Sequence, residues 1–277
     1  MGINEITMII KTFERPACVS KLVASIYKYY PNAIVRIGDD SEVSCKYDLE
    51  KKYANKDLKV YDLPKDCGLS YGRNFLLKKT KTKYFLLLDD DFVFDKKTKI
   101  LECLQMLIDQ DVDILGGYFR NYKIVNKGFD RLIVLAQSLL HYELPTNYIG
   151  TLNFDEDARV LSTAYETLRF PEFEMTDIVH NFFLAKTDKV RDENLWDEDL
   201  KLQEHTPFFL EAKRKGFKVA TTNQLSTRHM PERLKKYSGF RGRDFVQVFM
   251  NKYDVEKIIN THDGKNEKII LRKKIHD

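Results

Sequence analysis

Short apolar runs alternate with segments of helical apolar spacing through the first 120 residues, and this alternation limits the chain to few folds. The runs predict strands at 5–12, 33–40, 58–64, 83–91 and 112–119. The segments between them predict helices at 15–30, 47–54, 68–80 and 96–110. Strands that alternate with helices at this spacing are typical of a parallel sheet covered by helices on both faces, so we predict an α/β fold.

Composition narrows the class of protein. The chain has 277 residues, of which 43% are hydrophobic and 32% charged, enough to build one large core. Its net charge is +4, and no basic-aromatic stripe accompanies the predicted sheet, so we expect no nucleic-acid partner. No apolar run approaches the roughly 20 residues of a membrane span. Four widely spaced cysteines and a first segment unlike a signal peptide favour reduced thiols and a cytoplasmic location.

The second half of the sequence is less regular. From Arg120 to Glu174 the pattern predicts either an acceptor-side wall or irregular connections. A strand is expected at 177–187, a helix in the second half of 199–216 that ends at Gly216, and a strand at 217–221. From Arg228 onward 13 Lys or Arg face 7 Asp or Glu, and an amphipathic helix is expected around Phe245. We therefore predict a domain over 1–230, with halves at 1–120 and 121–230, and a basic helical extension over 231–277.

Carboxylates follow two of the predicted strands. Asp39 and Asp40 end one strand, and Asp89, Asp90 and Asp91 end the apolar run that starts at Lys83. Ligands of open α/β sheets bind beyond the carboxyl ends of the strands. Since alternate residues of a strand share a face, Asp89 and Asp91 should converge while Asp90 points away. Paired carboxylates suit Mg²⁺ or Mn²⁺ bound with substrate phosphates, and the alternative is a set of turn or helix-capping aspartates.

A glycine-containing segment, "KDCGLSYGRN" at 65–74, lies between the two acidic strand ends. Gly68 and Gly72 allow close approach of the backbone, and a helix N-terminus there would face a phosphate. Arg73 adds a permanent positive charge suited to phosphate or carboxylate. The alternative is an ordinary helix start.

Six motifs together resemble a known family. They are "TFERP", "GDDS", "GLSYGRN", "TKYFLLLDDDFVF", "ILGGYFRN" and "NFFLAKTDKVR", and the resemblance that they carry runs from about Ile6 to His229. In order and spacing they resemble nucleotide-sugar glycosyltransferases of the GT-A fold. The β-1,4-N-acetylgalactosaminyltransferase group is similar, as is, more distantly, the inverting family that contains cellulose and hyaluronan synthases. The resemblance implies a Rossmann-like α/β/α sandwich with a mostly parallel central sheet.

The resemblance also assigns roles in binding the sugar donor. It implies that Arg73 lies near the nucleotide and its phosphates, and that Asp89 lies near the ribose. Asp89 and Asp91 match the D-x-D pair that holds the metal, and His229 matches a histidine that completes the coordination of Mn²⁺ or Mg²⁺. The positions that match the nucleoside site are Thr12, Arg15, Asp39 and Asp40.

Catalytic and acceptor residues follow from the same resemblance. Glu204 matches an acidic residue at a helix start and is the candidate general base, with His205 orienting the site. The alternative for Glu204 is a helix N-terminal carboxylate favoured by the helix dipole. Asp177 and Asn181 match a region near the donor sugar or acceptor. Apart from the resemblance, Trp196 is the only tryptophan and is expected either to stack on a sugar or, equally, to pack in the core. The fallback bases are Asp197 and Asp199.

The predicted function is a metal-dependent, inverting transfer of GalNAc, GlcNAc or a hexose from a UDP-sugar to an oligosaccharide or lipid-linked glycan. Animal members of the group carry a membrane anchor and lumenal disulfides that we do not find here, which favours a bacterial enzyme of capsule or lipopolysaccharide synthesis. The basic tail is either a solvated surface or a peripheral contact with the inner face of the plasma membrane. Two alternatives are a nucleotidyltransferase, whose glycine-rich loop after the first strand is missing, and a non-catalytic nucleotide-sugar-binding subunit of a polymerase complex.

Overall fold

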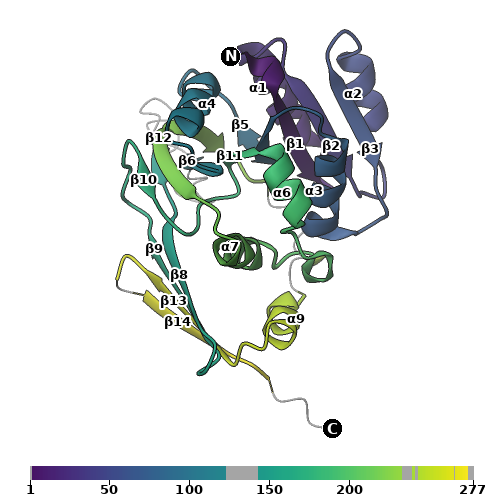
Figure 1. Ribbon diagram of the computed structural model, residues 1–277. Helices are drawn as coiled ribbons and strands as arrows, with labels where there is room; N and C mark the ends of the chain where they lie inside the picture. The colour runs from purple at the N-terminus through teal and green to yellow at the C-terminus, as the bar shows by residue number, and fades with distance from the viewer. Residues whose placement is uncertain (1, 123–142, 233–238, 241–242, 265, 274–277) are drawn as a thin grey trace, which may run out of the picture.

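The structure is a computed structural model that describes residues 2–122, 143–232, 239–240, 243–264 and 266–273. Its centre is a large mixed sheet with the strand order β10-β12-β6-β11-β4-β1-β2-β3. Helices cover both faces of this sheet, and a smaller sheet lies beside it (Figure 1). The predicted α/β class is therefore confirmed.

The first half of the chain forms the parallel part of the sheet. Its strands are β1 (Ile6–Thr12), β2 (Ile34–Asp39), β3 (Leu58–Asp62) and β4 (Tyr84–Asp89), and β1 lies between β2 and β4. A short 3-10 helix η1 (Ile3–Glu5) precedes them. The helices that alternate with them are α1 (Pro16–Tyr29), α2 (Lys46–Lys52), α3 (Gly68–Lys79) and α4 (Ile100–Asp109). Each of these four strands and four α-helices agrees with the sequence prediction to within a few residues.

Two hydrophobic cores, one on each face, hold this sheet in place. Along β1, Met8 and Ile10 join the core beneath α1 and α4, whereas Ile9 joins the core beneath α3 and α7. All seven residues of β1 are buried, as expected of a strand covered on both faces. On β4, Leu88 points to the first core and Leu87 to the second. This alternation fixes which face of the sheet each carboxylate at the end of the strand points to.

The second half of the chain completes the large sheet and reverses its direction. The strands are β5 (Phe92–Val93), β6 (Ile114–Tyr122), β7 (Glu143–Thr146), β10 (Glu174–Met175), β11 (Phe183–Lys186) and β12 (Val219–His229). β11 is antiparallel to both β4 and β6. The predicted strand at 177–187 is wrong in its first part, because the backbone of Ile178 bonds to that of Gly150 instead of joining β4. A Cβ at Gly150 would lie 2.1 Å from the Ile178 side chain, so the crossing requires glycine.

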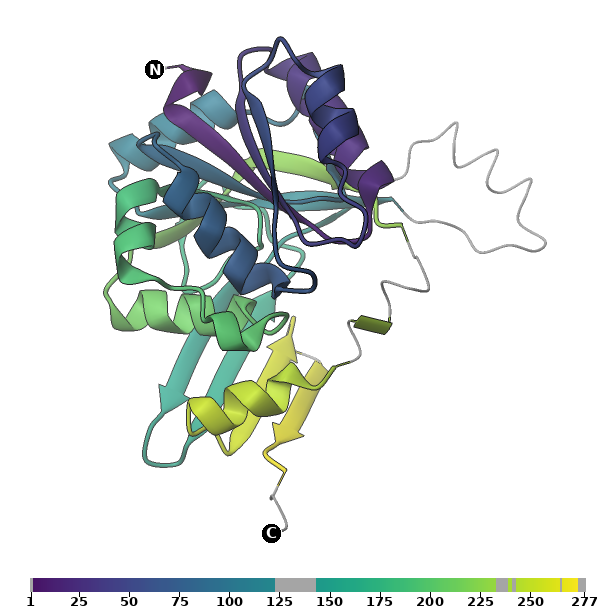
Figure 2. The same cartoon turned by 90° about the vertical axis from the view of Figure 1, so that its right-hand side faces the viewer.

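A smaller sheet joins the middle of the chain to the C-terminal part. Its order is β14-β13-β9-β8, in which β8 (Ile149–Asp155) pairs with β9 (Val160–Glu166), β9 pairs with β13 (Lys257–His262), and β13 pairs with β14 (Asn266–Leu271). The predicted helix around Phe245 is α9 (Phe245–Lys252), which lies beside these strands in Figure 2. The C-terminal part is thus more than a helical extension, and the domain boundary at residue 230 stays a prediction.

Three helical segments lie along the chain between β11 and β12 of the large sheet. They are α6 (Thr187–Glu193), the 3-10 helix η2 (Glu198–Leu200) and α7 (His205–Arg214). A third hydrophobic core contains Leu200, Leu210 of α7 and Phe249 of α9, so the C-terminal part packs against the helices that flank the large sheet. Gly216 has a φ of +68°, in agreement with the predicted end of α7. Within the described ranges, no helix is both long and apolar enough to cross a bilayer.

Candidate active site

Two adjoining cavities lie at the carboxyl ends of β1, β2 and β4. The first has a volume of about 30 Å³ and the second about 330 Å³. Lys11, Arg15, Leu69 and Leu202 line both, so the two cavities are neighbouring parts of one cleft. This is the edge of the sheet at which parallel α/β folds bind ligands.

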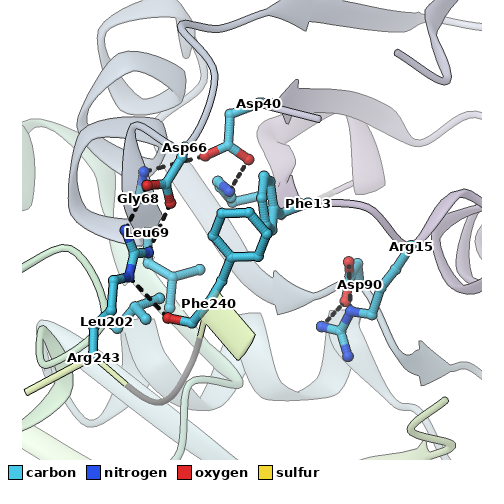
Figure 3. Close-up of a pocket in the computed structure, with 11 residues that line it drawn as sticks. Phe13, Arg15, Asp40, Asp66, Gly68, Leu69, Asp90, Leu202, Phe240 and Arg243 are labelled. Atoms are coloured by element: carbon cyan, nitrogen blue, oxygen red, sulfur yellow. Dashed lines mark hydrogen bonds and ion pairs between the residues drawn. The ribbon is translucent and has the colours of Figure 1, made fainter. Parts of the chain in front are cut away.

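The first cavity is bounded by two phenylalanines and three ion pairs (Figure 3). The ring of Phe240 meets that of Phe13 edge-on, with centroids 4.8 Å apart. Arg243 donates to both carboxylate oxygens of Asp66, one at 2.7 Å, and its Nε donates to the carbonyl of Phe240 at 2.9 Å. These contacts hold Phe240 against Phe13, although the two rings are far apart in the sequence.

Asp40 forms the polar side of the first cavity. It is buried, pairs with the ammonium group of Lys11, and accepts a 3.2 Å hydrogen bond from the backbone N–H of Gly68. A Cβ at Gly72 would lie 2.6 Å from the Lys11 side chain, so glycine lets the lysine reach Asp40. The Gly68 N–H at the start of this helix is directed to Asp40, and the phosphate contact of the helix start stays a prediction.

Asp39 has a different environment from Asp40. Its two carboxylate oxygens accept hydrogen bonds from the backbone N–H groups of Ser41 at 3.0 Å and Cys45 at 2.8 Å. The side chain is buried and lines neither cavity. Of the two predicted nucleoside-binding aspartates, only Asp40 therefore lies at the cleft, while Asp39 orders the loop after β2.

The three aspartates at the end of β4 divide between the cavities. Asp89 and Asp91 line the second cavity and Asp90 lines the first, as the alternation of the strand predicts. Asp90 accepts a 2.7 Å hydrogen bond from the Thr12 hydroxyl and pairs with Arg15. Burial raises the pKa of Asp90 to about 7 although Arg15 opposes the shift, and the charge of Asp91 raises it further. Thr12 and Arg15 are therefore held by Asp90.

Asp91 faces a histidine from the far side of the sheet. Its Oδ2 lies 3.5 Å from Nε2 of His229 and accepts a 2.7 Å hydrogen bond from Arg15. Burial alone would raise the pKa of Asp91, but the neighbouring His229 and the charge of Arg15 outweigh it and lower the pKa. His229 ends β12, which runs parallel to β6 and pairs with β5, so the fold brings it to β4 from 138 positions away.

The donor set fits a divalent cation bound by two side chains. Two ligands of one metal ion, each with a bond of about 2.0–2.2 Å, lie about 3 Å apart when they subtend a right angle. The 3.5 Å between Asp91 and His229 is close to that distance. Among the described residues no group of three His, Cys, Asp or Glu side chains is placed to hold a metal, and Asp89 as a further ligand stays a prediction.

Arg73 connects Asp89 to the candidate base. Its guanidinium donates to Glu204 at 2.6 Å and to Asp89 at 3.1 Å, and its side chain is 1% exposed. Asn181 also donates to Glu204, at 3.2 Å. Asp89 opens to the cavity, with 37% of its side chain exposed, but protein surrounds its other sides. Burial raises the pKa of Asp89 despite the opposing charge of Arg73, and the neighbouring carboxylates of Asp91 and Glu204 raise it further.

The wall opposite the aspartates is aromatic. His205 and His180 line the second cavity together with Tyr148 and Phe119. The Nε2 atom of His205 lies 2.7 Å from the carbonyl of Val179, and burial lowers the pKa of this histidine. The Tyr148 ring stacks on His180, with centroids 3.9 Å apart. His180 and Tyr148 are not among the predicted site residues. His180 belongs to no motif with an assigned role, and Tyr148 lies in the irregular stretch between Arg120 and Glu174.

Other predicted site residues lie away from the second cavity. The Trp196 ring is 1% exposed and stacks on Phe208 in the core, which does not agree with a sugar-stacking role. It instead packs beside Arg73, whose guanidinium carbon is 5.8 Å from the ring centre. Asp177 accepts hydrogen bonds from Lys213 and from the backbone of Leu152, at the junction of α7 and β8.

The fallback bases and the basic tail are engaged elsewhere. Asp197 and Asp199 both pair with Lys252 of α9, and neither lines either cavity. In the described part of the tail, Arg272 pairs with Asp254 and Lys273 with Asp244. These internal pairs favour the reading of the tail as a structural, solvated surface, and contact with a membrane stays a prediction.

Comparison with known proteins agrees with this geometry. The family described as Glycosyl transferase family 2 matches residues 7–171. The human Beta-1,4 N-acetylgalactosaminyltransferase 1 is 33% identical over 206 residues, which are 74% of this chain and 35% of that protein. The chain thus spans about a third of the length of the curated relatives it matches. The predicted resemblance to this group is confirmed.

Two solved structures share the fold. One is S. aureus TarS 1–349 in complex with UDP-GlcNAc, with a TM-score of 0.59 and 16% identity over 91% of this chain and 66% of that chain. The other is GalNAc-T7 with UDP, GalNAc and Mn²⁺, with a TM-score of 0.60 and 15% identity over 90% of this chain and 48% of that chain. The GT-A fold predicted from the motifs is confirmed by these likenesses.

Proposed function

The chain belongs to glycosyl transferase family 2, and from this premise we propose that it transfers a sugar from a UDP-sugar to a hydroxyl of a glycan acceptor. The observation that carries the proposal is the convergence of Asp91, His229 and Glu204 on one cavity. The transferred sugar is GalNAc, GlcNAc or a hexose. The names of the relatives, which transfer N-acetylgalactosamine, support an N-acetylhexosamine within this set.

The sugar donor would span both cavities. We place its base in the first cavity beside Phe13 and Asp40, and its sugar in the second, beside Asp89. Lys11 and Arg15 line both cavities, so their positive charges lie where the diphosphate would pass from the first cavity to the second. This arrangement supports a nucleoside diphosphate sugar over a small neutral substrate.

Asp91 and His229 would hold a divalent cation, Mn²⁺ in preference to Mg²⁺ because one ligand is an imidazole. When bound, such an ion offsets negative charge on the two phosphates of the leaving nucleotide. The chain's own contribution is to fix its two ligands, Asp91 through Arg15 and His229 through the packing of Phe119, whose ring centre is 4.8 Å away.

Glu204 would act as the general base. Within the part of the chain that the structure describes, its side-chain hydrogen bonds come from Arg73 and Asn181 and both fall on Oε1, so Oε2 is the oxygen proposed to accept the proton. The acceptor hydroxyl attacks the anomeric carbon, the bond from that carbon to the diphosphate oxygen breaks, and Oε2 takes the hydroxyl proton. Attack from the face opposite the leaving group inverts the anomeric configuration.

A panel of nucleotide sugars tests this proposal. We expect UDP and UDP-sugars to raise the melting temperature of the protein in the presence of Mn²⁺ and not in its absence, whereas GDP- and CMP-sugars have little effect. Stabilisation by GDP- or CMP-sugars would overturn the nucleotide assignment. The absence of any nucleotide response would overturn the enzymatic proposal and favour a structural role.

The acceptor and the location are further proposals. We propose an oligosaccharide or lipid-linked glycan of a bacterial capsule or lipopolysaccharide as acceptor, in the cytoplasm or at the inner face of the plasma membrane. Incubation with UDP-[³H]GalNAc or UDP-[³H]GlcNAc and extracted bacterial glycolipids tests this directly. Label that stays in the nucleotide fraction with every lipid and oligosaccharide acceptor would contradict it.

A further inference from the structure

Asn121 of β6 contacts the proposed metal ligand His229 directly, although no sequence motif assigned it a role. Its Oδ1 lies 2.8 Å from Nδ1 of His229, and its Nδ2 donates to the Thr146 hydroxyl at 2.9 Å. In the parallel pairing of β6 with β12, Asn121 lies directly beside His229. In the antiparallel pairing of β6 with β7, it lies two residues from Phe119, the partner of Thr146. Three neighbouring strands thus hold one amide in a fixed place.

The orientation of this amide sets which nitrogen of His229 carries the proton. A neutral imidazole has one N–H group and one lone pair, and an amide oxygen can only accept. Because Oδ1 of Asn121 faces Nδ1, the proton lies on Nδ1 and the lone pair on Nε2. That Nε2 atom lies 3.5 Å from the Oδ2 oxygen of Asp91. Two acceptors then face each other, an arrangement that a cation between them would satisfy.

The ring of His229 has little freedom to turn away from this arrangement. Phe119 packs against it at 4.8 Å and Phe92 at 5.9 Å between ring centres, and 26% of the side chain is exposed. Packing therefore restrains the plane of the ring, while the hydrogen bond from Nδ1 selects the tautomer. Metal-bound histidines commonly have such a partner on their second nitrogen, which raises metal affinity.

We propose that Asn121 is a positioning residue, which presents the Nε2 lone pair of His229 to a divalent cation shared with Asp91. The inference rests on the metal-dependent function proposed above. Asparagine is suited to the position because its oxygen accepts from Nδ1 while its nitrogen is anchored on Thr146. An apolar side chain of similar size would leave the tautomer free, whereas an aspartate would hold the N–H at least as firmly.

The test measures Mn²⁺ affinity, which needs no acceptor and no turnover. Free Mn²⁺ is followed by electron paramagnetic resonance in the presence of saturating UDP, for the wild type, Asn121→Leu and Asn121→Asp. Loss of such a partner typically weakens metal binding by about 10- to 100-fold. We expect Asn121→Leu to raise the Kd for Mn²⁺ by at least about tenfold and Asn121→Asp to leave it unchanged or lower it.

A matched control separates positioning from stability. Asn223 lies on β12, the strand that ends in His229, and its amide donates to the carbonyl of Phe170 at 3.0 Å. It lines neither cavity. We expect Asn223→Leu to lower the melting temperature without changing the Kd for Mn²⁺. A Kd that rises equally in both Leu variants would mean that general destabilisation explains the effect, and would overturn the inference.

The remaining outcomes distinguish the two proposals. Should the wild type bind no Mn²⁺ even with UDP, the metal-dependent function fails, and this inference fails with it. Should the wild type bind Mn²⁺ and Asn121→Leu bind it equally well, only the role of Asn121 fails. A loss in Asn121→Asp as large as that in Asn121→Leu would show that the amide nitrogen matters rather than the oxygen, which also overturns the inference.

Discussion

The two cavities of the cleft are built differently. In the first, the carboxylates of Asp40, Asp66 and Asp90 are each paired with a cation, and the volume of about 30 Å³ has room for only a water or two. In the second, the volume is about 330 Å³, and Asp89 and His229 are partly open to it. One part of the cleft is closed by its own side chains, whereas the other is open before any ligand arrives.

This difference indicates which steps of ligand binding require movement. The second cavity holds the groups proposed for chemistry in fixed positions, through Arg73 and through the packing around His229. The first must widen before a base can enter, and the ring that would have to move is Phe240, which comes from the C-terminal part of the chain. The groups proposed for catalysis are therefore preorganised, while the proposed path for the nucleotide is not.

The largest effect is expected at the open cavity, from Asp91→Asn. Removal of this ligand should lower kcat/KM for the UDP-sugar by about 10³-fold, since a metal supplies several kcal/mol to the transition state. Asp90→Asn should cost far less, because Asp90 faces the first cavity. Steady-state kinetics with the two variants side by side checks this. Equal losses would mean that Asp90 takes part in the same chemistry as Asp91.

Glu204→Gln should be the next largest change. A general base contributes about 10²- to 10⁴-fold, so kcat should fall by at least about 100-fold while the Kd for UDP, measured by calorimetry, stays the same. Glu211→Gln on the same helix is the control, because Glu211 pairs with Arg214 and lines neither cavity. Near-normal turnover of Glu204→Gln with intact UDP binding would end its assignment as the base.

A substitution in the first, closed cavity should strengthen ligand binding, in contrast to the losses of activity expected at the second cavity. Phe240→Ala removes an edge-on aromatic contact with Phe13, and such a pair is worth about 0.5–1.5 kcal/mol. We expect UDP to bind up to about tenfold more tightly to this variant, by isothermal titration calorimetry. Phe245→Ala is the control, since Phe245 also packs on Arg243 but lines no part of the cavity. Weaker binding to Phe240→Ala would show that the ring is a wall of the base site rather than an obstacle.

The smallest effect concerns the pH dependence of stability. The pKa of Asp90 is raised to about 7 in the folded state, from an ordinary value near 3.8 in the unfolded chain. Between these values the folded state binds more protons than the unfolded state, so the free energy of unfolding falls as the pH rises through this window. Urea denaturation from pH 4 to pH 8 should show this fall for the wild type relative to Asp90→Asn. A constant difference between the two proteins would contradict the raised pKa.

Much of the fold was predictable from local patterns. The period of apolar residues and the helix boundaries were enough to place β1 to β4 and α1 to α4, because each buries a regular face. The same alternation correctly separated Asp89 and Asp91 from Asp90. The antiparallel pairing of β11 with its neighbours and the existence of the small sheet were not predictable, since strand pairing between distant segments leaves no local signal.

The site shows the same division between local and long-range information. By itself the sequence determined which residue types are available at the ends of the strands, because apolar periodicity is a local property of the chain. Only the tertiary structure decided their partners, such as Arg73 with Glu204, Asn121 with His229 and Phe13 with Phe240. Trp196 shows why, since a lone tryptophan beside an acidic helix looks the same in sequence whether it lines a cavity or, as here, fills the core. The free energy that selects between such alternatives comes from contacts across the fold, which depend on how the elements pack.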